Sequence, residues 1–221
     1  MSLHLAFYLA RWGMYRGSCF IFHKDYKVHT PIVDEILKPE YDCLFGIACE
    51  GLRESEVQDR LEKLRDYIAD YFDPIREKIA GCQRTSSVSP VLITKILMGT
   101  LGCVPAYDRF FQDGVAKYKV TTQEYSRNSV LRLADFYEAH NDRLEEARRG
   151  MQCEVLTYPQ MKLLDMGFGR SGSCEHKDRC VAAGTIVLSV CSRGSVTDYT
   201  FQHLLLCGWR SDPASGRARV P

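Results

Sequence analysis

The chain has 221 residues, of which 45% are hydrophobic and 26% charged, and 29 Lys and Arg face 28 Asp and Glu for a net charge of +1. This composition is too apolar for a disordered chain and too poor in glycine and proline for a fibrous one. No run of about 18 apolar residues occurs, so no transmembrane helix is expected. The net charge excludes a uniformly basic nucleic-acid binder, and any such site must be local.

Helical periodicity and capping signals dominate the first 168 residues, which predicts a mainly α-helical fold. Thr30 and Ser89 each precede a proline, the pattern of an N-cap followed by proline in the first turn. Pro74 is expected to break or kink the long charged helix. Residues 117–122 are the best strand candidate. The expected helices cover residues 3–15, 30–37, 55–80, 89–98, 126–149 and 157–166.

The last 55 residues differ in composition from the helical body. Residues 167–221 hold seven Gly, seven Ser and four of the ten Cys, without a helical period. We therefore divide the chain into a helical body, residues 1–168, and an irregular C-terminal appendage, residues 169–221. A metal-binding cluster is the alternative for the appendage, but its irregular spacing disfavours one, and no metal is expected. That cluster would comprise Cys174, His176, Cys180, Cys191, His203 and Cys207.

The ten cysteines contain no C-x-x-C pair and do not resemble a disulfide framework. A chain of this length can build a core without disulfides. The N-terminal segment also lacks the basic region and cleavage site of a signal peptide. We therefore expect free thiols and a cytoplasmic protein.

The most distinctive segment spans residues 94–111. A helix that carries Lys95 ends at two glycines, and Pro105, Tyr107 and Asp108 follow. Asp108 would lie at the start of the next helix, where a carboxylate is stabilised by free backbone N–H groups. Two interpretations stay open from the residues alone. Asp108 is either a helix cap or a catalytic carboxylate, and Lys95 is either an ordinary surface lysine or a reactive amine.

A lysine-bearing apolar helix, a turn and then P-x-Y-D resembles the core of the helix-hairpin-helix DNA glycosylase superfamily, in a divergent form similar to glycosylase-like proteins of bacterial antiphage defence. The usual hairpin L-P-G-[IV]-G is absent, and residues 86–93 stand in its place. The resemblance implies a helical bundle, DNA as partner, no cofactor, and excision of a modified base. It further implies Asp108 as the catalytic carboxylate and Lys95 as a residue able to form a Schiff base.

A second candidate region covers residues 10–27, where four basic residues oppose one acidic residue. Trp12, Tyr15 and Arg16 suit base stacking and phosphate contact, and Ser18 could present its amide to a phosphate. Tyr107 and Arg109, which flank Asp108, complete the predicted substrate contacts. The alternative is a glycine-interrupted helix with its aromatic residues in the core.

Other functions stay open at this point. No phosphate-loop, Rossmann, hydrolase-elbow or zincin motif is present. A HEPN-like ribonuclease would use Arg132 and His140, although their spacing is longer than that family requires. A non-enzymatic module that binds nucleic acid or protein is the third hypothesis. His23 and His29, beside the basic region, are expected to face solvent. The oligomeric state is left undetermined.

Overall fold

Helices account for every regular element in the part of the chain that the structure describes. The computed structural model describes residues 1–16, 19–79, 87–151 and 157–173. The prediction of a mainly α-helical fold is therefore confirmed. In chain order the α-helices are α1 (Ser2–Arg11), α2 (Thr30–Ile36), α3 (Ser55–Glu77), α4 (Pro90–Thr100), α5 (Arg109–Lys117), α6 (Arg127–Ala139), α7 (Asn141–Gly150) and α8 (Gln160–Ser173).

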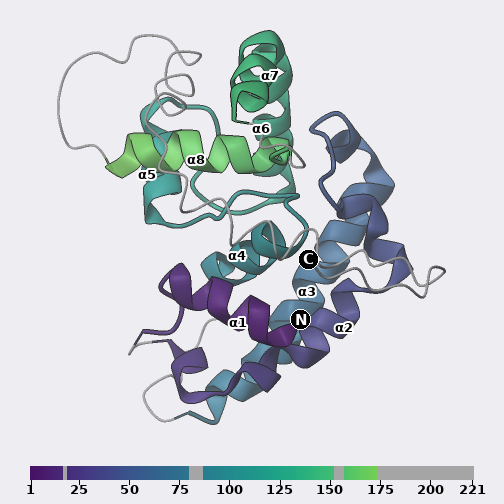
Figure 1. The fold of residues 1–221 in the computed structure, drawn as a ribbon, viewed down its shortest axis with the longest axis vertical. Coiled ribbons are helices and arrows are strands. Elements are labelled where there is room, and N and C mark those ends of the chain that lie inside the picture. Colours follow the sequence, from purple (N-terminus) through teal and green to yellow (C-terminus); the bar gives the residue numbers. More distant parts are fainter. Residues whose placement is uncertain (17–18, 80–86, 152–156, 174–221) are drawn as a thin grey trace, which may run out of the picture.

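Helix α4 lies at the centre of the fold, where it contacts α1 and α3; in Figure 1, α5 and α8 lie above it, α1 below it, and α2 and α3 on its right. Ser89 is its N-cap and accepts a hydrogen bond from the Val91 amide at 3.3 Å, as the Ser-Pro signal predicts. Every residue from Leu92 to Thr100 is buried. A helix that is apolar on all sides must be enclosed by other elements, which explains this central position.

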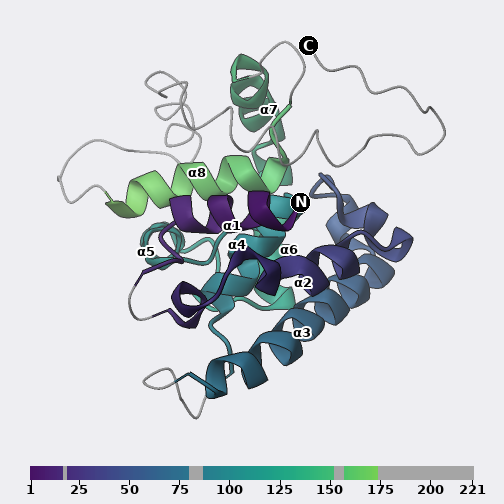
Figure 2. The ribbon, with the colours of Figure 1, turned by 60° about the horizontal axis from the view of Figure 1, so that its bottom comes forward.

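Close helix contacts fix the elements around α4. Helix α8 runs beside α5, and a side chain at Gly114 would overlap the backbone of Phe168. Helix α1 crosses α4 at Gly99, where the Tyr8 ring occupies the space that a side chain would need. Figure 2 shows α1 and α8 on the same side of the molecule, and α2 lying along α3. Gly99 thus permits the close approach of α1 to α4, and Gly114 permits that of α8 to α5.

Three predictions about elements are wrong. Pro74 does not break the long helix, because α3 continues through it to Glu77; the ring removes the N–H that would bond to the carbonyl of residue 70, but the helix ends only three residues later. Residues 117–122 form no strand, since α5 runs through Lys117 and the chain then turns at Lys119, whose φ is 54°. Residues 126–149 form two helices, α6 and α7, rather than one.

His140 separates α6 from α7. Its backbone adopts φ −123° and ψ 20°, outside the helical region. The Nδ1 atom of its ring lies 2.8 Å from the carbonyl oxygen of Phe136. A side chain that bonds to the last turn of its own helix competes with continuation of the backbone ladder. This local bond explains the break.

The predicted appendage lies largely outside the described residues. Helix α8 extends through Ser173, past residue 168, and residues 174–221 with their cysteines and histidines are not described. Of the described cysteines, Cys49 and Cys103 are buried, and Cys19 and Cys43 are half-buried, all with free thiols. None of the described helices has the length and apolarity needed to span a membrane.

Candidate functional site

Lys95 is the charged residue of the central helix, and it is buried with 6% of its surface exposed. The interpretation as a surface lysine is therefore wrong. Its ammonium donates a hydrogen bond to the backbone oxygen of Trp12 at 3.0 Å and lies 3.4 Å from Oδ2 of Asp108. Lysine is rarely buried without a partner, because removing an ammonium from water is costly. Lys95 thus joins the two segments that the sequence singled out.

Asp108 is both a helix cap and a member of this buried site. As the N-cap of α5, its Oδ1 accepts the Phe111 amide at 3.2 Å. Its Oδ2 faces Lys95 at a distance longer than a typical charge-assisted hydrogen bond, so this oxygen can accept a further donor. The Asp108 side chain is 25% exposed, against 7% for Lys95. The carboxylate is therefore the member of the pair that a substrate can reach.

A second ion pair lies beside the first. Lys162 and Asp165, one turn apart on α8, pair at 3.0 Å, and their side chains are 3% and 10% exposed. Oδ1 of Asp165 also accepts the Ala106 amide at 3.0 Å. Each oxygen of Asp165 thus has one partner, and Oδ1 anchors the backbone two residues before Asp108. Lys95, Asp108, Lys162 and Asp165 are referred to below as the lysine–aspartate cluster.

Trp12 covers the lysine–aspartate cluster. The Lys162 ammonium lies 4.7 Å, and that of Lys95 5.8 Å, from the centroid of the indole ring. Both distances suit cation–π attraction, which strengthens where water is excluded. Trp12 as a whole residue is 37% exposed. Trp12 therefore presents an aromatic surface to solvent above two ammonium groups.

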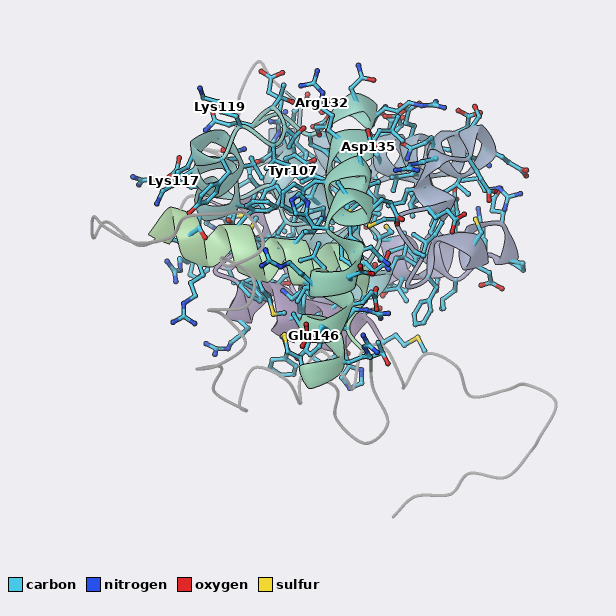
Figure 3. All side chains as sticks on the ribbon, turned by 90° about the horizontal axis from the view of Figure 1, so that it is seen from above. Tyr107, Lys117, Lys119, Arg132, Asp135 and Glu146 are labelled. Carbon is cyan, nitrogen blue, oxygen red and sulfur yellow. The ribbon has the colours of Figure 1, made fainter. Side chains whose placement is uncertain are left out.

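The other predicted substrate contacts are not gathered in one place. Tyr107 is fully buried near α6, with its hydroxyl 2.6 Å from that of Ser129 (Figure 3). Arg109 is 88% exposed and pairs loosely with Asp113. Arg16 is exposed, and its guanidinium lies next to Gly13, one residue from Trp12. Ser18 lies outside the described residues.

Tyr15 belongs to a separate pair with His29. The Tyr15 hydroxyl lies 2.7 Å from Nε2 of His29. The expectation that His29 faces solvent is wrong, because its ring is fully buried against Phe72. Burial lowers the pKa of His29 to about 4 and raises that of Tyr15 to about 12. Both groups are neutral at pH 7, and the pair holds the segment that follows Trp12.

The ribonuclease hypothesis gains no geometric support. Arg132 is exposed on the outer side of α6, near Asp135 (Figure 3). His140 lies eight residues further along, about 12 Å by the helical rise. One of its ring nitrogens is engaged by the Phe136 carbonyl.

No group of three or more potential metal ligands occurs among the residues described.

An acidic groove of about 600 Å³ lies along α3, apart from the lysine–aspartate cluster. Five carboxylates and one ammonium line it, and Lys38, Arg65 and Arg127 pair with four of these carboxylates from outside the lining. The lining residues are Glu35, Tyr41, Asp59, Glu62, Lys63, Asp66, Tyr67 and Asp70.

Comparisons with known proteins add no relative to this picture. No protein-family model, curated protein or solved structure matches the chain. The function of the chain is therefore inferred from the geometry and chemistry of the site itself.

One buried and one half-buried ion pair make this cluster the candidate functional site. Replacing a buried ion pair with well-packed apolar residues is often neutral or stabilising, so stability alone does not explain the pair of Lys162 with Asp165 beside a partly exposed Trp12. Lys162 and Asp165 were not among the site residues predicted from the sequence. The i,i+3 spacing of Lys162 and Asp165 was the available signal, but this pattern is common on solvated helix surfaces.

Proposed function

We propose that the chain is a DNA glycosylase-like hydrolase that cleaves the N-glycosidic bond of an extruded nucleotide, with Asp108 as the catalytic carboxylate. The observation that carries this proposal is the ion pair of Asp108 with buried Lys95 beneath Trp12. It supports the catalytic role because the Asp108 side chain stays 25% exposed while Lys95 faces one of its oxygens and the Phe111 amide bonds to the other.

In the proposed reaction, the bond between C1′ and the base nitrogen breaks, and its electron pair leaves with the base. Positive charge develops on the sugar, and the preorganised Asp108 carboxylate stabilises it. Lys95 neutralises Asp108 before the substrate arrives and fixes the orientation of Oδ2. Water then adds to C1′, and one of its protons passes to the base nitrogen that was bonded to the sugar.

The surroundings of the lysine–aspartate cluster suit an extruded base. Trp12 offers a stacking surface, as base-flipping enzymes require. Arg16, whose guanidinium lies next to Gly13, and Arg109, which follows Asp108 in the chain, are exposed and available for phosphate contact. A modified base is the favoured substrate class, and a role in defence against phage is part of the same proposal.

The test is incubation of the full-length protein with duplex DNA that carries single modified bases, and with phage DNA rich in them. Alkali cleaves DNA at abasic sites, so cleavage reports base excision. We expect Asp108→Asn to lower the rate at least about 100-fold, the usual scale for loss of one electrostatic catalytic group. Asparagine caps helices as well as aspartate does, so α5 should stay folded.

Asp113→Asn is the matched control, because it neutralises a carboxylate on the same helix outside the lysine–aspartate cluster. Its excision rate should equal that of the unmodified protein. Equal rates for Asp108→Asn and Asp113→Asn would refute the assignment of Asp108. Absence of abasic sites on every duplex and phage DNA would refute the glycosylase proposal.

A further inference from the structure

The segment that leads into Asp108 is a loop that runs through the core of the protein. Residues 102–107 form no helix, yet every one of them is buried. Loops usually lie at the surface, because a buried loop must find partners for its backbone amides inside the protein. Pro105 has no amide hydrogen, so Ala106 and Tyr107 supply the last two amides before Asp108. The partners of these two amides therefore help to fix the place of Asp108.

Two buried side chains from different helices accept these amides. Oδ1 of Asp165, on α8, accepts the Ala106 amide at 3.0 Å. Oγ1 of Thr94, on α4, accepts the Tyr107 amide at 3.1 Å. Thr94 is fully buried and Asp165 is 8% exposed, so little water can replace either acceptor. The loop is thus held between α4 and α8 immediately before Asp108.

Thr94 adjoins Lys95 on α4, so two successive residues of this helix act on Asp108. The ammonium of Lys95 faces the Asp108 carboxylate, whereas the hydroxyl of Thr94 holds the backbone one residue earlier. This hydroxyl also donates to the carbonyl oxygen of Pro90 at 2.8 Å. A hydroxyl can donate once and accept twice, so the bond to Pro90 leaves its oxygen free to accept the Tyr107 amide. The bond to Pro90 alone satisfies the donor, and the bond to Tyr107 is an additional link to the loop.

We propose that Thr94 is a positioning residue of the excision reaction, which together with Asp165 holds the loop so that the Asp108 carboxylate meets C1′ of the extruded nucleotide. This inference rests on the proposed function. Thr94 is fully buried, so it acts through the backbone before Asp108 and not on the substrate. A carboxylate stabilises the charge that develops on the sugar only where it is held in place, and a displacement of about 1 Å can lower a rate about 100-fold.

Two substitutions at Thr94 separate positioning from packing. Thr94→Val keeps the shape of the side chain but leaves the Tyr107 amide without its acceptor, and we expect single-turnover excision to fall at least about 10-fold. Thr94→Ser keeps the hydroxyl and removes a methyl group, so the excision rate should stay that of the unmodified protein. Both variants should melt at a lower temperature, through an unpaired amide in the first and a small cavity in the second. Affinity for the duplex DNA used in the assay should be unchanged in both, because neither variant alters an exposed side chain.

Thr100→Val is the matched control on the same helix. Thr100 is also buried, and its hydroxyl donates to the carbonyl oxygen of Ile96 at 2.7 Å, as that of Thr94 does to Pro90. This variant should keep the unmodified excision rate. Equal rates for Thr94→Val and Thr100→Val, or equal losses in Thr94→Val and Thr94→Ser, would overturn the role of Thr94 and leave the proposed function standing. If the unmodified protein excises no base, the proposed function fails first and the role of Thr94 fails with it.

Discussion

The ammonium of Lys162 lies 4.7 Å from the centre of the Trp12 indole ring, although 150 residues separate them in the chain. The contact joins the end of α1 to α8, and it sets an exposed aromatic ring over a buried positive charge. Lys95 approaches the same ring from α4. Trp12 is therefore held by two helices that are remote from it in sequence, which preorganises it as a stacking surface.

Replacing Lys162 alone should lower the free energy of unfolding more than replacing Lys162 and Asp165 together. Lys162→Met leaves the Asp165 carboxylate buried without its cation, and we expect a loss of about 3 kcal/mol in the free energy of unfolding. Asp165→Asn added to it removes the uncompensated charge while the amide oxygen still accepts from Ala106. The double variant should therefore recover at least about 1 kcal/mol.

Thermal and urea denaturation of both single variants and the double variant measure this coupling. The unmodified protein completes the cycle. If the double variant loses the sum of the two single losses, Lys162 and Asp165 act independently and the pair is not a coupled unit.

A methyl group at Gly99 should disturb both the fold and the site. Gly99→Ala forces the buried Tyr8 ring away from α4, and overpacking of this kind costs about 1–3 kcal/mol. We also expect slower excision, because Trp12 moves with α1. The measurement is a melting curve together with single-turnover excision.

Gly150→Ala serves as the control for this substitution. Gly150 ends α7, and nothing lies within 4 Å of a side chain placed there. Alanine should stabilise the protein by up to about 1 kcal/mol, through reduced freedom of the unfolded chain. Equal effects at the two glycines would contradict the close contact of α1 with α4.

His29 should make the fold sensitive to acid. Its pKa is lowered to about 4 in the folded state, against about 6.5 in the unfolded chain, so the unfolded chain binds the proton more readily. Above about pH 6.5, protonation of His29 therefore does not affect the free energy of unfolding. As the pH drops toward 4, this free energy falls by about 3 kcal/mol in total. His29→Gln should flatten this part of the pH profile.

Urea denaturation at intervals between pH 4 and pH 7 tests the role of His29. His23→Gln replaces an exposed histidine of the same segment and should leave the profile unchanged. A His29→Gln profile that parallels the unmodified protein would show that another group dominates the acid response.

Much of the helical architecture was predictable from local signals. The start of α4 follows from Ser89 and Pro90, since capping and the fixed φ of proline act within one turn. Asp108 at the start of α5 was predictable for the same reason. The break at His140 was not, because it depends on a ring that bonds back to its own helix rather than on periodicity.

The candidate site divides in the same way. The sequence by itself determined that the protein is helical, that Asp108 stands at a helix start, and that Lys95 and Trp12 belong to unusual segments. Only the tertiary structure decided that Lys95 is buried, and that the ammonium groups of Lys95 and Lys162 meet beneath the ring of Trp12. Helix starts are set by neighbours within about four residues. Burial and charge pairing depend on which helices meet. Here α1 can approach α4 because residue 99 is glycine, and α8 can approach α5 because residue 114 is glycine.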